Sequence, residues 1–217
     1  MTLRSASASA RRRPRARPVR VLIAGFGPFP GVPDNPAAGV ARRFAARAAR
    51  RPGGELQVSA AVVPTTWELL DDLPGLLARL RPDIIIALGV AVEAPVVRIE
   101  TIALNRATRI AVDAVGARAR SRRLRADGPP ALHAPADPGR LVRMARSLGL
   151  PLRISRDAGD YLCNGLFYEA TRLVRASGRT TRLAFVHVPR PHMARGARPA
   201  DFDAVVALTI TALKAGL

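Results

Sequence analysis

Short aliphatic runs alternate along the chain with longer stretches in which apolar residues recur at helical spacing. The aliphatic runs predict strands, and the run at residues 83–89 is continuous and apolar enough to lie at the centre of a sheet. The predicted strands are residues 19–24, 56–64, 83–89, 96–105, 152–155 and 182–189, and the predicted helices are residues 36–50, 65–80, 138–149, 160–178 and 201–217. This alternation predicts an α/β fold with a mainly parallel sheet and helices on both faces.

Residue types at the predicted helix ends support these assignments. Asn35 can cap the first helix, with Pro36 in its first position. Thr65 or Thr66 is expected to cap the second helix, and Pro74 inside it is expected to kink or divide it. In folds of this type the functional site lies where strands end and loops begin, so the candidate chemistry is sought there.

Length and composition indicate one folded unit. The chain has 217 residues, 48% of them hydrophobic, which is enough for one substantial core. We predict a single α/β domain over residues 19–217 and a disordered basic tail over residues 1–18, whose Ser, Ala, Arg and Pro residues do not favour packing. No apolar run approaches the roughly 18 residues of a membrane span, and no apolar signal core follows the basic start. We therefore expect no membrane association and a cytoplasmic location.

The net charge of +19 raises the question of nucleic-acid binding. Most of the excess comes from residues 1–20 and 106–125, which hold seven arginines each and, between them, one acid, Asp113. Neither block contains the interleaved aromatic residues that stack on single-stranded bases. We favour solvated charge over a polyanion site, and nucleic acid is not an expected partner.

The single cysteine, Cys163, excludes an intramolecular disulfide framework and a multi-cysteine zinc site, and we expect no metal and no cofactor. In the segment SRDAGDYLCNGLFY, a predicted strand ends at Ser155 and a helix begins near Asp160, which places Cys163 in the first helical turn. The free N–H groups and the positive end of the helix dipole there favour a thiolate and could stabilise an oxyanion. Cys163 is thus a candidate nucleophile; the alternative is a small buried hydrophobic residue.

A thiol nucleophile needs a base, and the chain has three histidines. His133 lies in a proline-rich loop without periodic structure, and His192 follows Pro191 in another loop. His187 instead ends an aliphatic strand, at the edge of the sheet where Cys163 is expected to emerge. It is the candidate base; the alternative is a core histidine whose ring is satisfied by the backbone.

Glu100 is an acid in the otherwise apolar segment VVRIETIALN, where an unpaired carboxylate would be costly. A polar group that orients the imidazole is the third member of many Cys-His sites. Glu100 is a candidate for that position; the alternative is a salt bridge to Arg98 or Arg106 at a sheet edge.

The first predicted strand runs into the loop GFGPFPGVPDNP, which begins like a nucleotide-binding turn with Gly25 and Gly27. The third glycine of a dinucleotide fingerprint is missing, because Pro30 stands in its place. Two phenylalanines, Phe26 and Phe29, crowd a loop that phosphate binding would leave as bare backbone. The loop is therefore better suited to an apolar or amphipathic group than to a phosphate.

Four blocks in this order resemble the pyroglutamyl peptidase I family, the pyrrolidone-carboxylate peptidases. The opening block is similar to the family pattern G-F-x-P-F-G-G followed by N-P, and Gly89, Glu100 and Asn105 follow its spacing of glycine, glutamate and asparagine. SRDAGDYLCNGLFY resembles the cysteine block S-x-x-A-G-x-[YF]-[VL]-C-[ND], and AFVHVP resembles the histidine block. The likeness extends from about residue 19 to about residue 215 and fits loosely between residues 106 and 125.

The resemblance implies a cysteine exopeptidase on a three-layer α/β/α sandwich with a twisted central sheet. It implies hydrolysis of the amide bond after an N-terminal pyroglutamate, through a thioester, with peptides as substrates. The family also tends to form homo-oligomers, so a dimer or tetramer is expected. The implied roles are nucleophile for Cys163, base and acid for His187, orienting carboxylate for Glu100, and walls of the pyroglutamate pocket for Phe26, Phe29 and Thr65.

The chain departs from the family pattern near the expected pocket. Bacterial members usually have an arginine six residues before the glutamate, where this chain has Ala94, and Pro30 replaces a motif glycine. Arg109 matches a basic family position only after a shift of one residue. These changes bear on substrate identity more than on reaction type. Two alternatives follow: a thiol amidase of the same family with another acyl preference, and a catalytically silent arginine-rich protein that binds a polyanion.

Overall fold

The computed structural model describes residues 17–50, 54–134, 137–193 and 198–217. Most of the predicted tail, residues 1–16, lies outside the described residues. Arg17, which the sequence analysis assigns to the tail, makes two hydrogen bonds from its guanidinium to the carboxylate of Asp83, at 2.7 and 3.0 Å. The folded part of the chain therefore begins no later than Arg17.

A six-stranded sheet forms the centre of the molecule. Its first four strands in spatial order are parallel, as the continuous aliphatic runs predict. The fifth strand is antiparallel to the fourth, and the sixth is parallel to the fifth. In spatial order the strands are β2 (Leu56–Val63), β1 (Val19–Phe26), β3 (Ile84–Ala91), β8 (Arg182–Pro189), β4 (Val97–Glu100) and β7 (Leu152–Ser155).

The single strand predicted at residues 96–105 is wrong, because the chain divides there into β4 and β5 (Ile102–Leu104). At the division the backbone N–H and hydroxyl of Thr101 both donate to the carbonyl of Ser155, at 2.9 Å. Beyond this point β5 leaves the central sheet and pairs with β6 (Ala131–His133) in a second, two-stranded sheet. His133 therefore ends a short strand, where the sequence analysis predicts a loop.

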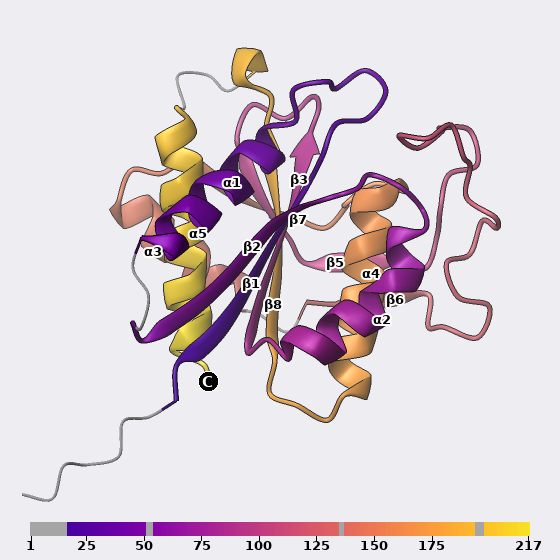
Figure 1. Ribbon diagram of the computed structural model, residues 1–217. Coiled ribbons are helices and arrows are strands. Elements are labelled where there is room, and N and C mark those ends of the chain that lie inside the picture. The colour runs from indigo at the N-terminus through magenta and orange to yellow at the C-terminus, as the bar shows by residue number, and fades with distance from the viewer. Residues whose placement is uncertain (1–16, 51–53, 135–136, 194–197) are drawn as a thin grey trace, which may run out of the picture.

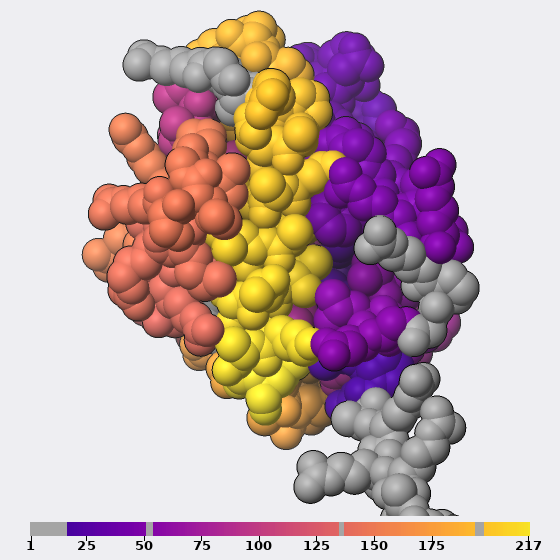
Figure 2. Space-filling model, turned by 90° about the vertical axis from the view of Figure 1, so that its left-hand side faces the viewer, coloured from indigo at the N-terminus to yellow at the C-terminus, as the bar shows by residue number. Residues whose placement is uncertain are grey.

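Helices cover both faces of the central sheet, which confirms the α/β/α sandwich (Figure 1). On one face lie α1 (Pro36–Ala49), α3 (Pro138–Ser147) and α5 (Pro199–Lys214), and on the other lie α2 (Leu69–Leu80) and α4 (Leu162–Ala176). On the first face α5 runs between α1 and α3 (Figure 2). Among the described residues, no helix is both long and apolar enough to cross a membrane.

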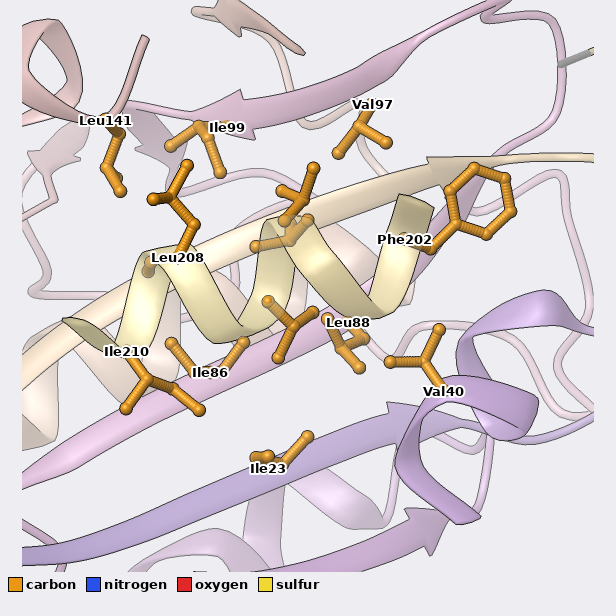
Figure 3. Packing of buried hydrophobic residues seen from close by; sticks show 14 of the residues in the cluster. Ile23, Val40, Ile86, Leu88, Val97, Ile99, Leu141, Phe202, Leu208 and Ile210 are labelled. Carbon is orange, nitrogen blue, oxygen red and sulfur yellow. The ribbon is translucent and has the colours of Figure 1, made fainter. Parts of the chain in front are cut away.

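The alternation of side chains along the strands divides the core into two clusters. In β8, Ala184 and Val186 belong to the cluster beneath α1, α3 and α5, whereas Phe185 belongs to the cluster beneath α2 and α4. Figure 3 shows the first cluster, in which Phe202 and Leu208 of α5 lie over the strands. His187 has the same parity as Phe185, so its side chain lies on the face of the sheet that α4 covers.

The helix ends test the predicted caps. Asn35 caps α1 by accepting a hydrogen bond from the N–H of Ala37, with proline in the first position as predicted. The cap predicted for the second helix is wrong, because α2 begins at Leu69 after Glu68, which makes no side-chain capping bond. Pro74 lies inside an undivided α2, and α4 begins at Leu162, two residues later than predicted.

Candidate active site

Cys163 is the second residue of α4. The first intrahelical hydrogen bond runs from the N–H of Gly165 to the carbonyl of Tyr161, so Cys163 lies within the turn whose own N–H groups have no acceptor in the helix. Its side chain is partly exposed. The predicted position at a helix N-terminus is therefore correct, and the helix dipole favours a negative charge there.

His187 and Glu100 meet on the face of the sheet that α4 covers. In the antiparallel pairing of β4 and β8, Glu100 lies opposite Phe185, which places it diagonally across from His187. The carboxylate oxygen Oε1 of Glu100 lies 2.8 Å from Nδ1 of His187, and the two residues are 0% and 6% exposed. Oε2 of Glu100 is buried without a hydrogen-bond partner among the described residues. The carboxylate of Glu100 is therefore paired with His187, and the alternative salt bridge from Glu100 to Arg98 or Arg106 does not form.

Cys163 lies against the other side of the imidazole ring. A Cβ atom added to Gly89 would lie 2.6 Å from Sγ of Cys163 and 3.2 Å from Nε2 of His187, so both atoms border the same small space. Gly89 is the Cα partner of His187 in the neighbouring strand β3. The absence of a side chain at Gly89 thus allows the sulfur to approach the ring.

The electrostatics of this pair favour a protonated imidazole. Burial alone would lower the pKa of His187. The negative charge of Cys163 and the hydrogen bond to it, together with the hydrogen bond and charge of Glu100, outweigh burial and raise the pKa of His187 to about 9. At neutral pH His187 is therefore an imidazolium, which the buried carboxylate of Glu100 holds beside the sulfur of Cys163.

The structure thus brings the three candidates Cys163, His187 and Glu100 together. The other two histidines lie elsewhere: His133 is exposed on β6, and His192 is exposed in the 3₁₀ turn η1 (Pro191–Met193). Among the described residues, no group of three or more His, Cys, Asp and Glu side chains could hold a metal ion. The close approach of Cys163 to His187 suits thiol chemistry.

The opening loop forms a tight turn beside this site. The backbone groups of Phe29 and Val32 bond to each other across Pro30 and Gly31, and Gly31 has a φ of +79°. Proline in the second and glycine in the third position suit a turn of this kind, so Pro30 fits a place where no N–H is required. The departure from the motif glycine is therefore compatible with the loop.

Hydrogen bonds tie the opening loop to its surroundings. The hydroxyl of Thr65 and the side-chain amide of Asn35 both donate to the carbonyl of Gly27, at 2.9 Å. Phe26 is buried in the core cluster beneath α4, whereas Phe29 is half-buried. The three predicted pocket residues thus differ: Phe29 offers a partly free ring, while Phe26 and Thr65 support the loop from below.

Two aromatic residues near the site lie outside the predicted pocket set. The ring centroid of Tyr161 is 5.8 Å from that of Phe29 and 5.8 Å from that of Trp67. Burial, and then the negative charges of Asp113 and Cys163, raise the pKa of Tyr161 to about 12, so its hydroxyl stays protonated and donates to the carbonyl of Val112. Sequence reasoning could have recognised Tyr161 as a site residue, because it lies two residues before Cys163 and directly ahead of the helix.

The arginine-rich segment 106–125 packs on α4 through polar groups that the sequence analysis did not recognise. Asp113, its one acid, is buried and accepts hydrogen bonds from the N–H groups of Trp67, Val115 and Ala117. The side chain of Asn164, the residue after Cys163, accepts a hydrogen bond from the N–H of Leu104 and donates to the carbonyls of Leu104 and Arg106. The segment is therefore fixed beside the candidate site.

Many arginines outside the site neutralise buried carboxylates. Three acidic residues are almost fully buried, and each forms ion pairs with two or three arginines. The groups are Asp83 with Arg17, Arg20 and Arg179, Asp203 with Arg43 and Arg47, and Glu169 with Arg125 and Arg172. A substantial part of the basic composition thus supports the fold.

A partly exposed thiol at a helix N-terminus, a buried histidine against it and a carboxylate behind the histidine form the arrangement that thiol hydrolases use. The fold places this group at the carboxyl ends of parallel strands, where α/β enzymes bind their ligands. Fold and site together define the chain as an α/β protein of the thiol-hydrolase class.

Comparisons with known proteins identify the family. The family model described as pyroglutamyl peptidase matches residues 19–211, so the chain belongs to the pyroglutamyl peptidase family. The chain is 33% identical over 170 residues to a pyrrolidone-carboxylate peptidase of Cupriavidus taiwanensis, covering 78% of this chain and 77% of the relative. It is 32% identical over 199 residues to one of Streptomyces coelicolor, covering 90% of each. A solved mutant pyrrolidone carboxyl peptidase from Pyrococcus furiosus superposes with a TM-score of 0.83 at 25% identity, covering 92% of this chain and 100% of that chain.

Proposed function

We propose that this protein is a pyroglutamyl peptidase, which hydrolyses the amide bond after an N-terminal pyroglutamate. The observation that carries the proposal is the continuous contact from Cys163 to His187 to Glu100 within a member of this family. The substrates are peptides that begin with pyroglutamate. A cytoplasmic location and a homo-oligomeric assembly are parts of the proposal that rest on composition and family likeness.

In the first half of the reaction, the Cys163 thiolate attacks the carbonyl carbon of pyroglutamate and forms a C–S bond. The free N–H groups at the start of α4 stabilise the oxyanion. The C–N bond then breaks as His187 transfers its proton from Nε2 to the leaving amine. A pyroglutamyl thioester remains on the enzyme.

In the second half, neutral His187 takes a proton from water, and the hydroxide attacks the thioester. The C–S bond breaks, pyroglutamic acid leaves, and the thiolate–imidazolium pair is restored. Glu100 accepts a hydrogen bond from Nδ1 throughout, which keeps Nε2 directed at the sulfur and stabilises the imidazolium.

The pyroglutamate ring is small, flat and uncharged, so it suits apolar walls with a few polar groups. We assign the accessible wall to Phe29 and Tyr161, whose rings contact each other beside Cys163. Phe26 and Thr65 hold the loop that carries Phe29. A shifted acyl preference is the nearest alternative, because Ala94 leaves the β3–β4 turn without the usual arginine.

The acyl-enzyme offers a direct test of this proposal. Acid-quenched mass spectrometry during turnover of a pyroglutamyl amide should detect a pyroglutamyl adduct on the peptide that contains Cys163. Parallel reactions with prolyl and alanyl amides should leave the cysteine free. An adduct from one of these other acyl groups, with none from pyroglutamate, would identify the amidase alternative.

A further inference from the structure

Arg98 lies directly beside the catalytic histidine. It is the second residue of β4 and the Cα partner of His187 in the antiparallel pairing with β8. Side chains opposite each other in such a pair point to the same face, with Cβ atoms about 4.5–5.5 Å apart. Glu100, two residues on, shares this face and bonds to His187. Arg98 therefore stands on the active-site face, next to the imidazole.

The guanidinium of Arg98 is available for a ligand. Its side chain is half-buried and, within the described part of the chain, makes no hydrogen bond or ion pair. Two other arginines differ, because Arg106 pairs with Asp157 and Arg190 donates to the carbonyl of Gly31. Because β4 is antiparallel to β8, the first residues of β4 lie at the sheet edge where the parallel strands end.

The order of strands assigns a direction to the bound peptide. The acyl-pocket loop leaves β1, and the Cys163–His187 pair lies over β3 and β8. Arg98 follows on β4, on the side of His187 away from the pocket. His187 gives its proton to the leaving amine, so the residue released after pyroglutamate must lie on its far side, above β4.

We propose that Arg98 binds a carboxylate on the leaving residue and that this enzyme favours short pyroglutamyl peptides, above all pyroglutamyl dipeptides. In a dipeptide the free carboxylate is one carbon away from the amide nitrogen that receives the proton of His187. A guanidinium binds a carboxylate through two parallel hydrogen bonds, which fixes the leaving residue in position. This inference rests on the proposed peptidase activity and names its substrate class.

The test compares kcat/KM for pyroglutamyl-alanine, with a free carboxylate, and pyroglutamyl-alanine amide, which lacks the charge. The native enzyme should favour the free acid by about tenfold or more, the size expected of a charge-assisted hydrogen bond. Arg98→Gln should bring the ratio close to one. Arg153→Gln is the matched control, because Arg153 is the exposed Cα partner of Arg98 one strand further from His187, and its ratio should equal that of the native enzyme.

Salt provides a second measurement that needs no variant. Raising the ionic strength should lower the acid-to-amide ratio of the native enzyme, because screening weakens the pairing of Arg98 with the carboxylate. Equal rates for the two substrates in the native enzyme, or an unchanged ratio in Arg98→Gln, would overturn the inference while leaving the peptidase intact. Hydrolysis of neither substrate would overturn the peptidase proposal itself.

Discussion

The carboxylate of Glu100 and the imidazole of His187 form a buried pair, with 2.8 Å between Oε1 and Nδ1. The pair joins two antiparallel strands, and its geometry follows from the diagonal register of Glu100 and His187. With Nδ1 occupied, Nε2 is the ring nitrogen that faces Cys163. We therefore expect the reactivity of the Cys163 thiol to depend on Glu100, which acts on it only through His187.

Glu100→Gln tests this dependence. The neutral amide no longer stabilises the imidazolium, so we expect kcat/KM for a pyroglutamyl amide to fall by about 10²–10⁴-fold. Circular dichroism should show that the variant folds. Glu68→Gln, which changes an exposed acid before α2, is the control and should keep full activity. Activity in Glu100→Gln close to that of the native enzyme would remove Glu100 from the mechanism.

The pH profile tests the ionisation of His187. In the proposed mechanism His187 gives a proton to the leaving amine, and this proton is present below its pKa of about 9 and is lost above it. We therefore expect kcat/KM to decline as the pH rises through about 9. Glu100 raises the pKa of His187, so Glu100→Gln should move this decline to lower pH. A decline at the same pH in both proteins would contradict this account.

Gly89→Ala tests the contact between Cys163 and His187. The added methyl group would lie 2.6 Å from Sγ, so the sulfur must move away from the ring. We expect at least about a hundredfold loss of kcat, the cost of a small misplacement of reacting groups. Gly75→Ala is the matched control, because a Cβ atom there meets nothing within 4 Å. It lies in α2 and should retain activity with slightly higher thermal stability.

Two phenylalanine variants separate pocket from core. Phe29→Ala removes a half-buried ring from the proposed acyl wall, and we expect KM to rise about tenfold or more with little change in unfolding temperature. Phe26→Ala removes a side chain that is 1% exposed, which should destabilise the fold by about 3–5 kcal/mol. Steady-state kinetics and thermal melts of both variants check this. A large stability loss in Phe29→Ala with unchanged KM would move Phe29 from the pocket to the core.

The sequence predicted the layered fold well, because long aliphatic runs and helical periodicity mark elements that are buried in a regular way. It failed where tertiary contacts decide local structure. The break between β4 and β5 depends on bonds from Thr101 to the distant Ser155, and α2 starts late because Thr65 bonds to Gly27 instead of capping the helix. Such long-range hydrogen bonds leave no periodic signal in the chain.

In the candidate site, too, some residues could be predicted from the local sequence and others depend on tertiary structure. Cys163 and His187 were accessible to sequence reasoning because each carries chemistry at a strand or helix end, and Glu100 because it is an acid in an otherwise apolar segment. Gly89 and Arg98 were not recognised as neighbours of His187, because their position depends on which strands flank β8 and in what register. Strand order in a sheet of six is a property of the whole fold and cannot be read from one segment.

Everything proposed for this protein depends on the hydrolysis of pyroglutamyl amides by Cys163. The most direct measurement is release of a fluorescent amine from a pyroglutamyl amide by the reduced native enzyme and by Cys163→Ala, with the corresponding prolyl amide as the control substrate. We expect steady turnover of the pyroglutamyl amide by the native enzyme, none by the variant, and none with the prolyl amide. Absence of turnover in folded, reduced native enzyme, or equal turnover in Cys163→Ala, would contradict it.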